Sequence, residues 1–265
     1  MSANTSKSKN AKPEQLLIGI HPVAAALNSS PGLLGRLVIA QESGNPRVLE
    51  LEQQARALGI KVERLPRSLL DQRCDGERHQ DVLADFTANN VWAERDLDRL
   101  LAAIVGPPLI LVLDGVQDPH NLGACLRTAE AAGVDLVIVP KDRSAALSPV
   151  ARRAASGAAE VMTIVSVTNL ARVLRKLKDQ GVWLAAATDQ AETSLYATDL
   201  TGPMAMVMGG EGQGLRRLTE ELCDYHVRIP MFGTVSSLNV SVATAICIYE
   251  IVRQRNVHNG SEAPE

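Results

Sequence analysis

The sequence predicts an α/β protein with two unequal domains, the larger of which is built on a parallel sheet. Its 265 residues exceed one typical domain and fall short of three. Short β-prone runs alternate with helical segments along most of the chain. In the second half these runs are apolar throughout, which is typical of parallel strands that are buried on both faces.

The first part of the chain indicates a small α/β domain between a polar tail and a linker. Residues 1–13 have no apolar period, so we expect a disordered tail there. The small domain is expected at 14–88, with strands at 16–20, 37–40 and 60–64 and helices at 22–28 and 47–58. A linker is expected at 89–107, with an amphipathic helix at 89–103, because Gly106-Pro107-Pro108 then interrupts the chain.

The larger domain is expected at 108–255 and is followed by a flexible tail at 256–265. Its strands are expected at 109–113, 136–139, 161–165, 183–187, 204–208 and 227–229, and its helices at 122–132, 169–180, 215–222 and 240–253. Parallel sheets bind ligands beyond the carboxyl ends of their strands. We therefore expect the functional residues just after the strands.

The composition is that of a soluble globular protein, with 46% hydrophobic and 22% charged residues. Neither a signal peptide nor a membrane-spanning run is present, so a cytoplasmic protein is expected. The histidines lack the spacing of metal ligands, and we expect no metal. The four cysteines are widely spaced and are expected to be reduced and structural: Cys74, Cys125, Cys223 and Cys247.

Binding of RNA by base stacking is not favoured by this composition. Only 3% of the residues are aromatic, and the net charge is −3, so any basic patch for phosphates must be local. Five arginines follow strand ends and are candidate phosphate contacts, although solvated surface charge is the commoner fate of such residues. They are Arg143, Arg152, Arg153, Arg216 and Arg217.

The loop after the first strand of the larger domain leads into a helix that carries a candidate catalytic residue. Asn121 is placed to cap this helix. Arg127 lies opposite the apolar stripe of the helix, and Gly123, one turn earlier, is expected to clear space beside its guanidinium. Taken alone, Arg127 is also compatible with a solvated surface residue.

Two further segments follow strands of the larger domain. The segment 208–214 contains four glycines and Glu211, and glycines there would allow the backbone to approach a ligand, although an ordinary strand-to-helix turn is the alternative. It lacks the G-x-G-x-x-G pattern of dinucleotide sites, and no G-x-S-x-G hydrolase elbow occurs in the chain. The segment 229–239 is polar and precedes an apolar helix, which Ser237 or Asn239 is placed to cap.

In this order, the three segments resemble the TrmH branch of the SPOUT RNA methyltransferases. The resemblance implies a deep trefoil knot, a homodimer and S-adenosylmethionine as cofactor. It implies cofactor contacts at Gly209, Glu211, Ile229, Met231 and Leu238. Arg127 matches the family's catalytic arginine, with Asn121, Glu211, Ser237 and Asn239 around it.

The small domain resembles the ribosomal-protein-like substrate-binding domain of the subgroup that methylates a guanosine of 23S rRNA. The resemblance thus implies transfer of a methyl group to the ribose 2'-hydroxyl of a guanosine in 23S rRNA. A tRNA guanosine as substrate, or a non-catalytic RNA-binding role in ribosome assembly, are the alternatives. Two roles for Arg127 stay open, namely general base and electrostatic clamp, because a guanidinium rarely gives up its proton.

Overall fold

The computed structural model describes residues 15–74, 76–86, 91–212 and 214–258. The chain forms two compact units, Met1–Asn89 and Asn90–Glu265. The tail expected at 1–13 and the end of the tail expected at 256–265 lie outside the described residues. Residues 256–258, by contrast, continue the last helix, so the flexible tail expected there is wrong for these three.

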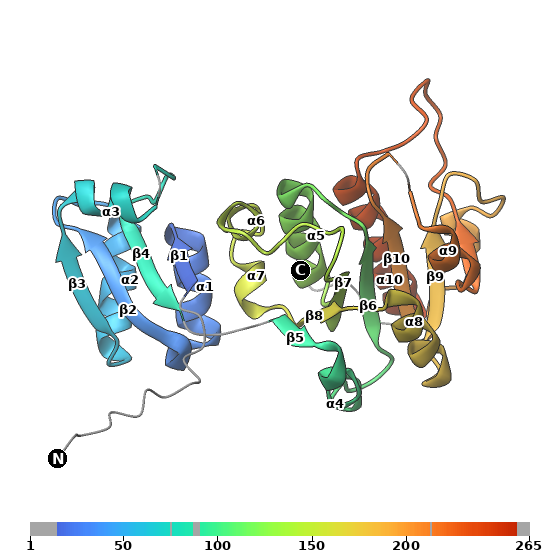
Figure 1. The fold of residues 1–265 in the computed structure, drawn as a ribbon, viewed down its shortest axis with the longest axis horizontal. Coiled ribbons are helices and arrows are strands. Elements are labelled where there is room, and N and C mark those ends of the chain that lie inside the picture. Colours follow the sequence, from blue (N-terminus) through green and yellow to red (C-terminus); the bar gives the residue numbers. More distant parts are fainter. Residues whose placement is uncertain (1–14, 75, 87–90, 213, 259–265) are drawn as a thin grey trace, which may run out of the picture. The chain divides into compact units, whose positions relative to one another are not determined.

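The N-terminal unit is a four-stranded mixed sheet in the order β1-β4-β2-β3 (Figure 1). Helices α1 and α2 pack on one face around Leu17, Leu37 and Phe86, and α3 packs on the other around Leu70. The sequence had indicated neither α3 nor β4. The elements are β1 (Gln15–Ile18), α1 (Ile20–Ser29), β2 (Leu34–Ala40), α2 (Pro46–Ala57), β3 (Lys61–Leu65), α3 (Arg67–Arg73) and β4 (Val82–Phe86).

The C-terminal unit is a seven-stranded sheet in the order β11-β9-β10-β6-β7-β8-β5, and all of its pairings are parallel. This confirms the expected α/β class with a parallel sheet. The strands are β5 (Val91–Ala93), β6 (Leu109–Asp114), β7 (Leu136–Pro140), β8 (Ile164–Val167), β9 (Trp183–Ala187), β10 (Met204–Gly209) and β11 (Tyr225–Val227).

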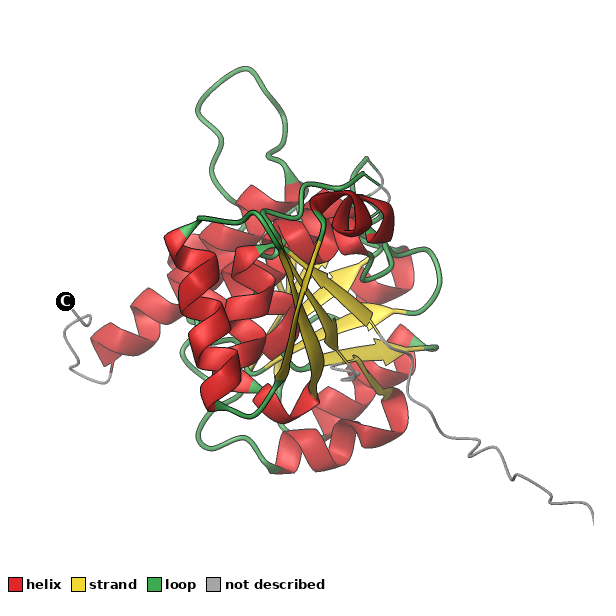
Figure 2. Ribbon diagram, turned by 90° about the vertical axis from the view of Figure 1, so that its left-hand side faces the viewer, coloured by secondary structure: helices red, strands yellow, loops and turns green. Residues whose placement is uncertain are grey.

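Helices cover both faces of this sheet (Figure 2). One face carries α5 (Pro119–Ala131), α6 (Pro149–Ala154), α7 (Ala158–Val161) and α10 (Val240–His258). The other face carries α4 (Leu97–Ala102), α8 (Leu170–Asp179) and α9 (Arg217–Glu221). In the described part of the chain, no helix combines the length and the apolar character needed to cross a bilayer.

Three expected elements differ from the structure. The strand expected at 227–229 is found earlier, as β11 at Tyr225–Val227. Within the linker helix expected at 89–103, Val91–Ala93 form strand β5, and α4 begins only at Leu97, which is fully buried. This segment therefore completes the sheet of the C-terminal unit. The strand expected at 161–165 begins later, because the β-prone Val161 ends helix α7.

The last helix is anchored at both ends to segments that are distant in sequence. Near its C-terminus, the Arg255 guanidinium donates hydrogen bonds to the carbonyls of Pro107, Pro108 and Gly202. Near its N-terminus it packs on α5, where the thiol of Cys125 lies 3.5 Å from the hydroxyl of Thr244. All four cysteines are buried, and burial raises the pKa of Cys125 to about 11, which agrees with the expected structural role.

Candidate functional site

The three segments singled out in the sequence meet at the carboxyl edge of the C-terminal sheet. Strands β6 and β10 are neighbours, and their register pairs Asp114 with Gly209. The loops that follow these two strands therefore leave the sheet side by side. Helix α10 packs against α5 on one face of the sheet. The first residues of α10 therefore lie near the loops that follow β6 and β10.

A chain of hydrogen bonds connects one polar side chain from each segment. The amide of Asn121 donates to Glu211 Oε1 at 2.5 Å. The amide of Asn239 donates in turn to Asn121 Oδ1 at 3.0 Å. Glu211 also accepts a bond of 3.4 Å from the backbone N–H of Gln117. Residues up to 118 positions apart are thus joined in one polar cluster.

The capping roles expected for these residues are only partly confirmed. Asn121 lies within α5, and Asp118 caps this helix instead, by accepting from the N–H of His120. Asn239 does cap α10, because its Oδ1 accepts from the backbone N–H of Ser241 at 2.9 Å. Asn239 therefore caps a helix and joins the polar cluster at once, whereas Ser237 is exposed in the preceding loop.

The glycines of segment 208–214 allow close packing of the backbone. A β carbon at Gly209 would lie 2.3 Å from the carbonyl carbon of Gly214, and one at Gly210 would lie 2.0 Å from the oxygen of Gly115. Gly212 has a φ of +82°, in the left-handed region. These glycines let the loop pack tightly on itself and on the segment after β6, so that Glu211 reaches Asn121.

A buried carboxylate at the end of β6 is a feature that the sequence did not single out. The Asp114 side chain is fully buried, and its Oδ1 lies 2.7 Å from the guanidinium of Arg216. The backbone N–H of Arg216 also donates to Oδ2. Arg216, one of the candidate phosphate contacts, thus fixes the start of α9 against the sheet. The only sequence signal was a charged residue at the end of an apolar strand.

Arg127 is exposed on α5, and its guanidinium donates a long bond of 3.4 Å to the hydroxyl of Ser156. Ser156 lies in the turn between α6 and α7 and has a left-handed φ of +51°. The space expected beside the guanidinium at Gly123 does not exist. A β carbon on Gly123 would lie 2.3 Å from the carbonyl oxygen of Ala151, because α6 packs directly on α5 there.

An ion pair lies beneath this turn. Arg152, predicted to be either a phosphate contact or solvated surface charge, is instead buried and donates to Glu160 Oε1 at 2.9 Å. The Glu160 side chain is fully buried, and desolvation raises its pKa to about 7, although Arg152 opposes this rise. Arg143, Arg153 and Arg217 are exposed, and Arg217 pairs with Glu221.

The residues expected to contact a cofactor lie at the carboxyl ends of β10 and β11 or in the segments that follow these strands. Both strands pair with β9, so Gly209 ends one strand and Ile229 follows the other on the same edge of the sheet. Met231 and Leu238 lie in the segment 230–239, which stands away from the sheet (Figure 1). Ile229, Met231 and Leu238 are half-buried, whereas Phe232 is 98% exposed.

Comparisons with known proteins agree with this arrangement. A family model described as the SpoU rRNA Methylase family matches residues 108–249, and one described as RNA 2'-O ribose methyltransferase substrate binding matches residues 16–92. The 23S rRNA (guanosine-2'-O-)-methyltransferase RlmB of Pseudomonas syringae pv. tomato is 51% identical over 240 residues, which cover 91% of this chain and 96% of that protein.

Solved structures show the same likeness. The SpoU methyltransferase AviRb from Streptomyces viridochromogenes, in complex with the cofactor AdoMet, has a TM-score of 0.77 and 26% identity, covering 92% of this chain and 91% of that one. The A. aeolicus TrmH/SpoU tRNA modifying enzyme has a TM-score of 0.53 and 32% identity. That match covers 63% of this chain and 85% of the A. aeolicus chain.

Proposed function

The chain belongs to the SpoU rRNA methylase family, and on that premise we propose that it methylates the ribose 2'-hydroxyl of a guanosine in 23S rRNA with S-adenosylmethionine. The observation that carries the proposal is the hydrogen-bonded cluster of Asn121, Glu211 and Asn239. It joins the three family segments at the edge of the sheet where parallel folds bind their ligands. The family expected from the sequence is confirmed.

The residues at this edge fit an adenosyl sulfonium. Ile229, Met231 and Leu238 supply half-buried apolar surface, and Gly209 offers backbone without a side chain. Glu211 is the one charged residue among the proposed cofactor contacts, and its negative charge suits a cationic ligand. When bound, the cofactor supplies an electrophilic methyl group. We assign cofactor binding to these five residues.

Arg127 is assigned the electrostatic role in catalysis. Its exposure leaves most of the guanidinium's donors available to an RNA phosphate or to the oxygen that attacks. A guanidinium keeps its proton, so the hydroxyl proton passes to water or to another group and not to Arg127. The hydrogen bonds among Asn121, Glu211 and Asn239 hold α5, the glycine loop and the start of α10 together. We assign Ser237, in the loop before α10, to the border of the same site.

We further propose a homodimer and a knotted C-terminal unit, as the family resemblance implies. Exposed apolar side chains support the dimer, because α10 and the preceding loop present surface that a second copy would cover. These side chains are Phe232, Val235, Val242 and Tyr249, which are 98%, 62%, 47% and 48% exposed. We also propose a cytoplasmic location, because the proposed substrate is ribosomal RNA.

The tRNA alternative is disfavoured by the N-terminal unit. Residues 16–92 match the substrate-binding model, whereas the likeness to the tRNA modifying enzyme covers only 63% of this chain. The deciding experiment incubates the protein with labelled S-adenosylmethionine and either 23S rRNA or tRNA, then maps 2'-O-methyl groups. Methylation of tRNA alone, or failure to bind the cofactor, contradicts the proposal.

Variants of Arg127 test its assigned role. We expect Arg127→Ala to lower kcat by about 100-fold or more. Arg127→Lys should retain part of the activity, because it keeps the positive charge but loses the planar set of N–H donors that can bind two oxygens at once. Arg175→Ala is the matched control, because Arg175 is exposed on α8, on the opposite face of the sheet. Full activity of Arg127→Lys and Arg127→Ala would remove Arg127 from the mechanism.

A further inference from the structure

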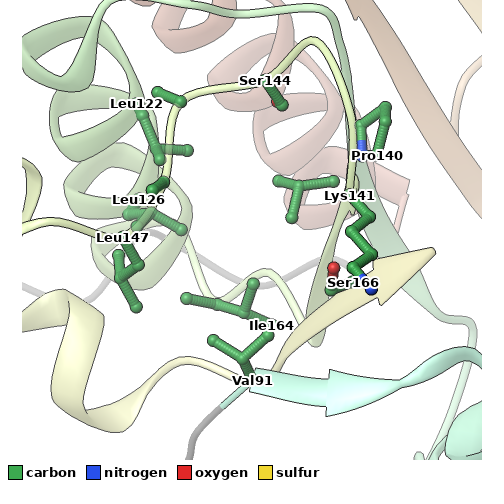
Figure 3. Close-up of a pocket in the computed structure, with 12 residues that line it drawn as sticks. Val91, Leu122, Leu126, Pro140, Lys141, Ser144, Leu147, Ile164 and Ser166 are labelled. Carbon is green, nitrogen blue, oxygen red and sulfur yellow. The ribbon is translucent and has the colours of Figure 1, made fainter. Parts of the chain in front are cut away.

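A cavity of about 230 Å³ lies in the C-terminal unit between α5 and strands β5, β7 and β8 (Figure 3). Its walls are mainly aliphatic. Leu122, Leu126 and Leu147 line one side, and Lys141 and Ser166 lie together on the other. Ser144 borders it at the loop that follows β7. The cavity is therefore a slot with apolar walls and a polar margin.

This cavity is separate from the proposed cofactor residues. Those residues follow β10 and β11, whereas the cavity covers the half of the sheet formed by β7, β8 and β5. Strand β6 lies between the two halves. The established chemistry of methyl transfer therefore leaves the cavity without a role.

The cavity is nevertheless tied to the catalytic segments. Its wall residues Leu122 and Leu126 lie on α5, the helix that carries Asn121 and Arg127. Ser144 and Ala145, which line the cavity from the loop after β7, are hydrogen-bonded to the loop after β6. The N–H of Ala145 donates to the Val116 carbonyl at 2.8 Å, and the Ser144 hydroxyl donates to the same carbonyl at 3.3 Å. A molecule bound in the cavity would therefore contact α5 and the loop after β7, both of which are connected to the proposed catalytic residues.

We propose that this cavity receives a nucleobase of the substrate RNA, next to or at the methylated guanosine. The inference rests on the proposed function. Enzymes that act on one nucleotide hold an unstacked base between apolar side chains and contact its polar edge. Here the leucines and Ile164 supply apolar surface, and the hydroxyls of Ser144 and Ser166 supply the edge contacts.

Charge favours this occupant over an apolar side chain of a protein partner. The exposed Lys141 lies at the polar margin, where its ammonium group reaches a phosphate of the same strand. Among the described residues that line the cavity none is aromatic, and the whole chain has only two Phe, three Tyr and two Trp residues. Aliphatic walls therefore replace the aromatic platforms on which RNA-binding proteins usually stack bases.

Filling the cavity tests the proposal. Ala146 is exposed at the cavity, so Ala146→Trp introduces an indole there without disturbing a buried position. We expect the KM for a 23S rRNA fragment to rise about 5- to 100-fold, the loss that removal of one base contact produces. The Kd for S-adenosylmethionine and the melting temperature should not change. Ala131→Trp, exposed on α5 away from the cavity, is the control.

A second variant and a direct probe make the test independent of folding. Lys141→Ala should raise the KM for RNA without changing cofactor binding. In an RNA fragment with 2-aminopurine beside the target guanosine, binding should change the emission with the unmodified protein and with Ala131→Trp, but not with Ala146→Trp. The proposal that the cavity binds a nucleobase is contradicted if Ala146→Trp and Lys141→Ala both keep the KM of the unmodified protein. It is also contradicted if these variants lower kcat while RNA binding stays unchanged. Failure of the unmodified protein to methylate rRNA overturns the proposed function instead.

Discussion

Gly123 is the position at which a single added methyl group should displace the candidate catalytic arginine. In Gly123→Ala, the new β carbon would meet the carbonyl oxygen of Ala151 at 2.3 Å, the β carbon of Ala154 at 2.5 Å and the nitrogen of Ala155 at 2.9 Å. All three atoms belong to or adjoin the backbone of α6, so no flexible side chain can yield. Helix α6 must move away from α5.

Overpacking of this kind costs about 1–3 kcal/mol. For a unit of this size, each kcal/mol lowers the melting temperature by about 2–4 °C, so we expect a decrease of about 2–12 °C. Because Ser156 lies two residues after the end of α6, separation of the helices also removes the partner of Arg127. Methylation of rRNA should therefore fall more than cofactor binding.

Calorimetry and steady-state kinetics check both effects. Gly44→Ala is the control, because a β carbon there meets nothing within 4 Å. Surface substitutions change the melting temperature by only about 1 °C. If the melting temperature of Gly123→Ala lies within that range of the control, the close contact between α5 and α6 is refuted.

Two further predictions concern the turn beneath Arg127. Ser156→Gly removes the hydroxyl but tolerates the φ of +51°, so kcat should fall about 2- to 5-fold without loss of thermal stability. Ser156→Asn, which keeps a polar group in a left-handed conformation, should restore part of this loss, and equal kcat for all three proteins would exclude a positioning role. Burial raises the pKa of Glu160 to about 7, above the value of about 4.3 in an unfolded chain, so the folded state holds the proton to higher pH. The unfolding free energy should then decrease as pH rises from about 4.5 to about 7, by up to about 3 kcal/mol from this group. Glu160→Gln should gain stability relative to the unmodified protein between pH 5 and 7.5 in denaturant titrations, and a constant difference would contradict the raised pKa.

The pattern of apolar runs predicted most of the C-terminal sheet because its strands are buried on both faces. Strands β6, β7, β9 and β10 were expected within one residue of their observed bounds. The pattern failed at β5, whose three residues are too few to establish a period. It also failed at Val161, where a β-branched residue ends a helix of four residues.

The order of the three motifs in the sequence predicted which residues belong to the candidate site. It did not predict which other residues these side chains contact. Gly123 was correctly singled out for the wrong reason, because helix α6, which fills the space above it, had no clear apolar period in the sequence. Arg152 was expected at the surface because its partner, Glu160, lies eight positions away, across a turn that propensity does not reveal. Long-range pairs depend on packing that local patterns do not encode.

The polarity of the Asn239–Asn121–Glu211 chain explains why amides, and not carboxylates, occupy its first two positions. The N-terminus of α10 offers free N–H donors, so Asn239 turns its oxygen toward Ser241 and must present its NH2 group to Asn121. Asn121 accepts with its only side-chain oxygen and is left with NH2 for Glu211. The carboxylate is thus the one acceptor that can end the chain. Aspartate at position 121 would place two carboxylates in contact and would repel the glycine loop, so the capping requirement of one helix dictates a side chain on a second helix and one in a distant loop.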